Sequence, residues 1–187
     1  AALLARQIRL RSASPQPLIQ VWRCDADTGA VATTVFGATS PILSELHDLQ
    51  LVWDEGLRAK IRAFRKEGLP RETGGVLLGF FDLKRSRGYV VDALPAPPDS
   101  VRSQAEFARG IAGLEAAVKD AQQRTGNVVS YVGEWHSHPR GVEPSPSHRD
   151  LRLLVHLALF LHQDGLPALM LIVGDDAEQW MIASVRK

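Results

Sequence analysis

The pattern of hydrophobic and polar residues predicts a chain in which β-strands and amphipathic helices are interleaved. Apolar or alternating runs bounded by turn residues predict strands at residues 18–23, 31–36, 49–53, 76–81, 89–93, 128–135, 169–173 and 179–185. Apolar residues that recur at helical spacing predict helices at about 54–67, 103–126 and 148–163, with a short helical turn at 40–46. This mixture of strands and helices indicates an α/β (α+β) fold class.

The first 47 residues differ from the rest of the chain. A turn-rich start, which ends in the sequence SASPQP, is followed by two β-prone runs that are expected to form a hairpin. We therefore divide the chain into residues 1–47, an N-terminal extension or the remnant of a preceding domain, and residues 48–187, the principal domain. Because the sequence begins with Ala and not Met, we expect that it was cut from a longer protein.

The composition is that of an ordinary globular domain. Lys and Arg (22 residues) nearly balance Asp and Glu (21 residues), so a nucleic-acid partner is not expected. No apolar run is long enough to span a bilayer, so a membrane partner is not expected either. The only cysteine, Cys24, excludes an intrachain disulfide and fits a reducing compartment, so we expect a cytoplasmic protein.

Two histidines stand at the end of the strand predicted at 128–135. His136 and His138 are one residue apart, and a strand directs such alternate side chains to the same face. The sequence Ser147-x-x-Asp150 follows in an irregular, Pro-rich stretch and can bring a carboxylate back to the histidines. Two imidazoles and one carboxylate suit a zinc ion with one open position for water. Chance spacing of two histidines and a plain helix cap at Ser147 remain the alternatives.

A hydrolytic metal centre also needs a group that moves protons, and Glu72 is the candidate. It precedes the strand at 76–81 and is followed by Gly74 and Gly75, which permit close approach of the backbone beside a site. Alone, Glu72 is an ordinary loop carboxylate. Together with the downstream histidines, it is expected to act as a general acid and base.

Three of these segments together resemble a known family. The sequence ETGGVLLG at 72–79, GEWHSHP at 133–139 and P-S-x-x-D at 146–150 is similar to the JAMM family, also called MPN-plus or JAB-domain metalloproteases. The resemblance covers about residues 48–187. It implies a cytidine-deaminase-like fold, in which a curved mixed β-sheet is flanked by helices. The hairpin in residues 1–47 would then be an extension of this fold.

The resemblance also assigns roles by motif position. It implies that His136, His138 and Asp150 bind one zinc ion (Zn2+) per chain and that Glu72 is the general acid and base. Ser147 is expected to hydrogen-bond the tetrahedral intermediate. Residues that bind substrate are not identified.

The implied activity is that of a zinc isopeptidase acting on the tail of ubiquitin or of a bacterial ubiquitin-like protein. Processing of a sulfur-carrier protein or a small peptide conjugate is an alternative, and a non-catalytic module that binds a ubiquitin-like protein is another. The chain runs directly from Asp150 into a helix and so lacks one insertion typical of members that select a polyubiquitin linkage. A compact bacterial type is therefore expected, with a ubiquitin-activating-type domain in the same chain or operon as a further expected partner.

Overall fold

The computed structural model describes residues 18–37 and 39–185, which fall into two compact units, Ala1–Ser40 and Pro41–Lys187. In the first unit, β1 (Leu18–Cys24) and β2 (Val31–Gly37) pair in antiparallel fashion and confirm the predicted hairpin. Their turn is held by Asp25, whose carboxylate accepts hydrogen bonds from the backbone of Asp27 and Thr28. Residues 1–17 of the predicted extension lie outside the described residues, and the division at residue 47 stays a prediction.

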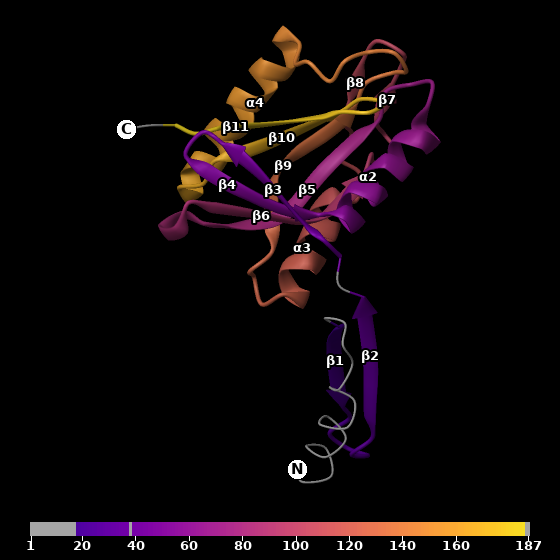
Figure 1. The fold of residues 1–187 in the computed structure, drawn as a ribbon, viewed down its shortest axis with the longest axis vertical. Coiled ribbons are helices and arrows are strands. Elements are labelled where there is room, and N and C mark those ends of the chain that lie inside the picture. Colours follow the sequence, from indigo (N-terminus) through magenta and orange to yellow (C-terminus); the bar gives the residue numbers. More distant parts are fainter. Residues whose placement is uncertain (1–17, 38, 186–187) are drawn as a thin grey trace. The chain divides into compact units, whose positions relative to one another are not determined.

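The described residues of the second unit form a seven-stranded mixed sheet with the order β11-β10-β9-β5-β6-β4-β3 (Figure 1). The strands are β3 (Pro41–Leu46), β4 (Leu49–Asp54), β5 (Gly74–Asp82), β6 (Arg87–Pro95), β9 (Ser130–Ser137), β10 (Ala168–Val173) and β11 (Glu178–Ala183). The pairs β4·β6 and β9·β10 are parallel, and the other pairs are antiparallel. The two edge strands, β3 and β11, contact each other, so the sheet is strongly curved.

Helices cover both faces of this sheet (Figure 1). They are α2 (Glu55–Gly68), α3 (Leu114–Arg124) and α4 (His148–Leu161), with one-turn 3-10 helices at Leu83–Arg85 and His162–Asp164. Alternate residues of β10 belong to separate cores. Leu169 and Leu171 pack in the core that contains α2, whereas Met170 and Ile172 pack with α4. The predicted mixed fold with helices around a curved sheet is confirmed.

The helical turn predicted at 40–46 is wrong, because these residues form strand β3. Ile42 and Leu46 pack against the main core, and Leu43 between them is exposed. This alternation of buried and exposed side chains fits a strand. Antiparallel pairing with β4 completes a hairpin at the edge of the sheet.

The helix predicted at 103–126 begins only at Leu114. Residues before it form a small hairpin of β7 (Val101–Arg102) and β8 (Phe107–Ala108) and a loop. Ser103 does not cap a helix, because its side chain accepts a hydrogen bond from the N–H of Ala105 within the hairpin turn. Local side-chain bonds of this kind compete with helix formation.

The basic residues of α2 attach this helix to the sheet. Arg58 donates two hydrogen bonds of 2.8 Å to the carboxylate of Glu178 on β11, and Arg62 donates another of 2.8 Å. Burial disfavours ionisation of Glu178, but these hydrogen bonds outweigh it and hold its pKa below the usual value.

Within residues 18–37 and 39–185, no helix is both long and apolar enough to cross a membrane.

We predict that Glu178→Gln lowers the free energy of unfolding at pH 7 by about 1–3 kcal/mol, because it breaks charge-assisted hydrogen bonds. Since the pKa of Glu178 is lowered in the folded state, its contribution is present above the unfolded pKa and is lost as the pH falls through the folded pKa. The difference in the free energy of unfolding between the wild type and Glu178→Gln should therefore become smaller at acidic pH. Urea unfolding at several pH values measures it, with Glu67→Gln at an exposed position of α2 as the control. An equal effect of both substitutions would contradict the prediction.

Candidate metal centre

His136 and His138 lie at the end of β9, with Ser137 between them. Only 8% of His136 and 9% of His138 is exposed, and their ring centroids are 5.4 Å apart. Trp135 packs in the core that contains α2, and its indole N–H donates to the carbonyl oxygen of Leu94 at 3.0 Å. The alternation predicted from the sequence therefore separates the histidines from Trp135.

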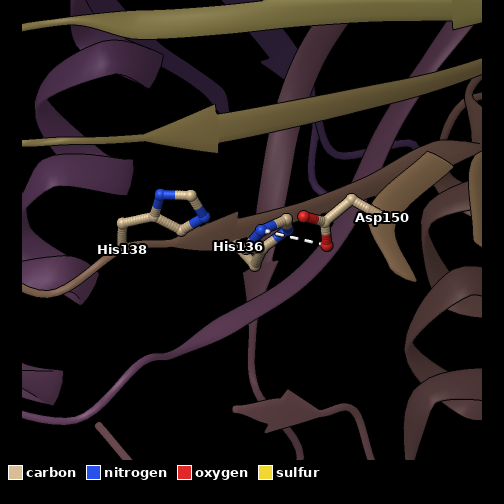
Figure 2. A group of neighbouring side chains, drawn as sticks. All are labelled: His136, His138 and Asp150. Carbon is tan, nitrogen blue, oxygen red and sulfur yellow. Dashed lines mark ion pairs between the residues drawn. The ribbon is translucent and has the colours of Figure 1, made fainter. Parts of the chain in front are cut away.

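Asp150 reaches the histidines from the first turn of α4 (Figure 2). Ser147 precedes this helix as its N-cap, and the two residues form a reciprocal capping box. One carboxylate oxygen, Oδ2, accepts from the backbone N–H and the hydroxyl of Ser147, both at 2.7 Å. The other oxygen, Oδ1, lies 3.5 Å from Nε2 of His136. Asp150 is thus part of the helix cap and also faces the histidines.

This cluster has the geometry and the chemistry of a metal site. One ligand atom from each of His136, His138 and Asp150 lies within 4.8 Å of the others. Nδ1 of His138 is 2.6 Å from the carbonyl oxygen of Glu143, so Nδ1 carries the proton and Nε2 is left as the ligand atom. Burial lowers the pKa of His136 to about 4 although Asp150 opposes the shift, so this imidazole is neutral. Two imidazoles and a carboxylate fit zinc.

Glu72 lies in the same cavity, which has a volume of about 150 Å³. Its neighbour Thr73 is tied to the histidine strand: the N–H of Ser137 donates to the carbonyl of Thr73 at 2.7 Å, and the N–H of Thr73 donates to the Ser137 hydroxyl at 3.2 Å. Burial raises the pKa of the Glu72 carboxyl, and the charge of Asp150 adds to this shift. A carboxyl whose pKa is raised holds a proton more readily than an exposed carboxyl, which suits a group that moves protons beside a metal site.

Gly74, the second residue after Glu72, permits the close packing of this region. A Cβ at Gly74 would collide with the ring of Phe107 on β8 and with the carbonyl oxygen of Trp135. A side chain at this position would therefore separate β5 from the histidine strand. This agrees with the close approach of the backbone that the Gly pair predicts.

Comparison with known proteins identifies the family. The family model described as prokaryotic homologs of the JAB domain matches residues 54–183, which is most of the chain. The chain belongs to this family. The predicted family is therefore confirmed, and the matched region contains Glu72 and the three clustered residues.

Curated relatives of this JAB domain include two proteins named CD-NTase/cGAS isopeptidase. The protein from Enterobacter hormaechei subsp. hoffmannii is 38% identical over 105 residues, which cover 56% of this chain and 56% of that protein. The one from Escherichia coli is 32% identical over 104 residues, which cover 55% of this chain and 62% of that protein.

More distant similarities are found with a third relative and a solved structure. A probable metalloprotease, y4qB, from Sinorhizobium fredii is 21% identical over 110 residues, which cover 59% of this chain and 66% of that protein. The chain thus matches less than two thirds of the length of each of these relatives. The solution structure of protein DSY2949 from Desulfitobacterium hafniense has a TM-score of 0.49 and 22% identity, and the match covers 70% of this chain and 80% of that one.

Arg65, which the sequence did not single out, holds the segment that follows His138 in this JAB domain. Only 7% of Arg65 is exposed, and its guanidinium donates to the carbonyl oxygens of His138 at 3.2 Å and Pro139 at 3.3 Å. It also pairs with Asp175 at 2.7 Å, and Asp175 accepts from the N–H of Gly141 at 2.7 Å. This bonding fixes the turn through which the chain leaves β9 and so fixes the backbone of His138.

A signal for Arg65 was present in the helical spacing of α2. Leu57, Ile61 and Arg65 follow one another at intervals of four residues, and all three are buried. Charged residues of an amphipathic helix usually lie on its solvent-facing side, but Arg65 lies on the buried side. A cation on the buried face of a helix requires partners, and the backbone carbonyls beside the site supply them.

We predict that Arg65→Ala weakens zinc binding by about 10- to 100-fold, because the backbone that carries His138 loses its support. Competition with a chromophoric chelator measures the zinc affinity. Arg58→Ala is the matched control, since Arg58 lies on the same helix but pairs with Glu178. Equal zinc affinities of the two variants would refute the positioning role of Arg65.

Proposed function

We propose that this chain is a zinc-dependent isopeptidase or peptidase that cleaves after the C-terminal tail of ubiquitin or a bacterial ubiquitin-like protein. The observation that carries the proposal is the presence of Glu72 in one cavity with His136, His138 and Asp150. A metal that served only to stabilise the fold would not require a half-buried carboxylate beside its ligands. Membership of the JAB family and similarity to isopeptidase relatives support the same class of reaction.

In this proposal His136, His138 and Asp150 hold one zinc ion per chain. When bound, zinc supplies Lewis acidity, which acidifies water and polarises a carbonyl group. Glu72 takes the proton from the attacking water and hands it to the leaving amine. Its N–H donates to the carbonyl of Ser103 at 2.7 Å, which fixes the backbone from which Glu72 lines the cavity.

Ser147 is proposed to donate a hydrogen bond to the oxyanion of the tetrahedral intermediate. Because Asp150 only accepts hydrogen bonds, the Ser147 hydroxyl 2.7 Å away donates to Asp150 in this structure. The same hydroxyl accepts from the N–H of Asp150 at 3.2 Å. Rotation of the hydroxyl hydrogen toward the oxyanion would therefore accompany the reaction, while the cap bond from Asp150 stays in place.

The proposed substrate is an extended tail ending in Gly-Gly, because the cavity around the ligands is small. The hairpin of β7 and β8 and the start of α4 contribute Phe107, Arg149 and Leu153 to its wall. Arg149 pairs with Glu106 across the cavity, from α4 to the hairpin turn. A cavity of this size favours residues without side chains next to the scissile bond. A ubiquitin-activating-type domain in the same chain or operon is the proposed source of such conjugates.

Two alternative functions differ from the proposed one in what is cleaved. A peptidase for a sulfur-carrier protein or a small peptide conjugate would use the same site on another tail. A non-catalytic module would bind the ubiquitin-like protein and leave its tail intact. A panel of ubiquitin, bacterial ubiquitin-like proteins and sulfur carriers, each with a C-terminal extension, separates these functions by which protein is cleaved.

We predict that Glu72→Gln lowers kcat on the cleaved substrate by about 100- to 10,000-fold, because general acid-base catalysis is lost. The zinc content should remain that of the wild type, since Glu72 is not among the clustered ligand atoms. Rates of cleavage and metal analysis of the same samples measure the two effects.

Glu67→Gln provides the control for the Glu72 variant, because it removes an exposed carboxylate that does not line the cavity. Loss of an exposed charge should change the rate by no more than about fivefold. Equal activity of the wild type and Glu72→Gln, or undiminished cleavage after zinc is removed by a chelator, would reject the mechanism.

A further inference from the structure

A buried ion pair lies beside the metal site on the same strand. Glu134 precedes His136 by two residues on β9, so both side chains lie on the same face of the sheet. Only 5% of Glu134 is exposed. Its Oε1 accepts from the guanidinium of Arg109 at 2.7 Å and from the hydroxyl of Tyr131 at 3.3 Å. Burying a charged pair is costly unless its geometry is good, and a functional role would account for its presence here.

The loop after β8 holds Arg109 in a fixed position. Arg109 donates to the carbonyl of Gly110 at 2.9 Å, and the N–H of Gly110 donates to the Ser100 hydroxyl at 2.9 Å. The carboxylate of Asp99 accepts from the N–H groups of Ile111 at 3.0 Å and Ala112 at 3.1 Å. The guanidinium is therefore oriented both by its own loop and by Glu134 before any ligand arrives.

Arg109 lies where the metal cavity meets a larger groove. Arg109, Glu134 and Leu153 line both the metal cavity and a groove of about 690 Å³ between α3 and α4. The side chain of Arg109 is 22% exposed, so the guanidinium is partly accessible. An extended polypeptide that runs from this groove to the metal ligands passes Arg109.

The chemistry of a guanidinium indicates which side of the scissile bond it would contact. Arginine has only donors, so it requires an acceptor on the substrate. On the amine side of an isopeptide bond, the lysine side chain offers methylene groups and no acceptor. On the acyl side, each residue of the tail offers a carbonyl oxygen.

We propose that Arg109 is a substrate-binding residue that donates a hydrogen bond to a main-chain carbonyl of the tail on the acyl side. Glu134 and His136 are two residues apart on β9, which is about 7 Å in a strand. The bound carbonyl therefore lies about two residues before the scissile one. This inference rests on the proposed function and assigns part of its substrate-binding site.

Short fluorogenic amides of increasing length test the proposal with the zinc-loaded chain. Acetyl-Gly-aminocoumarin lacks the required carbonyl, whereas acetyl-Gly-Gly-aminocoumarin and acetyl-Ala-Gly-Gly-aminocoumarin contain it. Arg109→Ala should lower kcat/KM on the two longer substrates by roughly 10- to 100-fold, the effect of one hydrogen bond to a charged group. It should leave kcat/KM on the shortest substrate nearly unchanged, and Arg109→Lys should recover part of the loss on the longer ones.

Arg102→Ala is the matched control for a general disturbance of the loop. Arg102 lies on β7 and donates to the carbonyl of Ala96 at 3.2 Å, but it lines neither cavity. This variant should lower kcat/KM equally, if at all, for short and long substrates. An equal loss on all lengths in Arg109→Ala, or no loss in both Arg109→Ala and Arg109→Lys, would overturn the proposal.

A binding measurement separates failure of this inference from failure of the proposed function. The peptide acetyl-Ala-Ala-Gly-Gly-amide is titrated into Glu72→Gln and into Glu72→Gln combined with Arg109→Lys, with NMR as the readout. The second protein should bind the peptide several-fold more weakly while retaining the same zinc content and Tm. Equal binding overturns the role of Arg109, whatever the rates show. If the wild type cleaves none of the substrates, the proposed function fails, and this titration still decides whether Arg109 binds the tail.

Discussion

The pairing of β5 with β9 is the interaction on which the site depends. Gly74 lies opposite His136 in this antiparallel pair, so the residues just before β5 are brought to the end of β9. Two hydrogen bonds between Thr73 and Ser137 extend the pairing beyond the strands. A shift of the register by one residue would turn Glu72 away from the histidines, because neighbouring side chains point to opposite faces. The backbone of the sheet thus determines the distance between Glu72, the proposed acid-base residue, and the cluster of His136, His138 and Asp150.

The other parts of the site are attached to this pair by contacts from separate elements. Helix α4 contributes Asp150, which the capping box orients, and α2 contributes Arg65, which fixes the segment after His138. The loop before α3 contributes Arg109, whose ion pair with Glu134 lies between the metal cavity and the groove. Burial of both faces of the central strands keeps these elements in place. The hydrophobic cores therefore provide the rigidity that a preorganised site needs.

Many strands and helices and the common direction of the two histidines could be predicted from the sequence, because they follow from local periodicity, whereas the curved sheet was implied by the family resemblance. A few consecutive residues suffice to recognise the uninterrupted apolar run of β10 and the spacing of His136 and His138. The sequence could not show the hairpin that displaces the expected helix start at Ser103, since its stability comes from bonds such as those of Asp99 to distant N–H groups. The contacts of Arg65 and Arg109 were missed for the same reason, because their partners are far away in the sequence.

X-ray diffraction from zinc-soaked crystals at the zinc absorption edge tests the central claim most directly. We expect one anomalous peak at about 2.0–2.2 Å from a nitrogen of His136, a nitrogen of His138 and a carboxylate oxygen of Asp150. Glu72 should lie beside this peak without bonding to it. Absence of a peak among these three residues, or a zinc ion bonded to Glu72 in place of Asp150, would contradict the account.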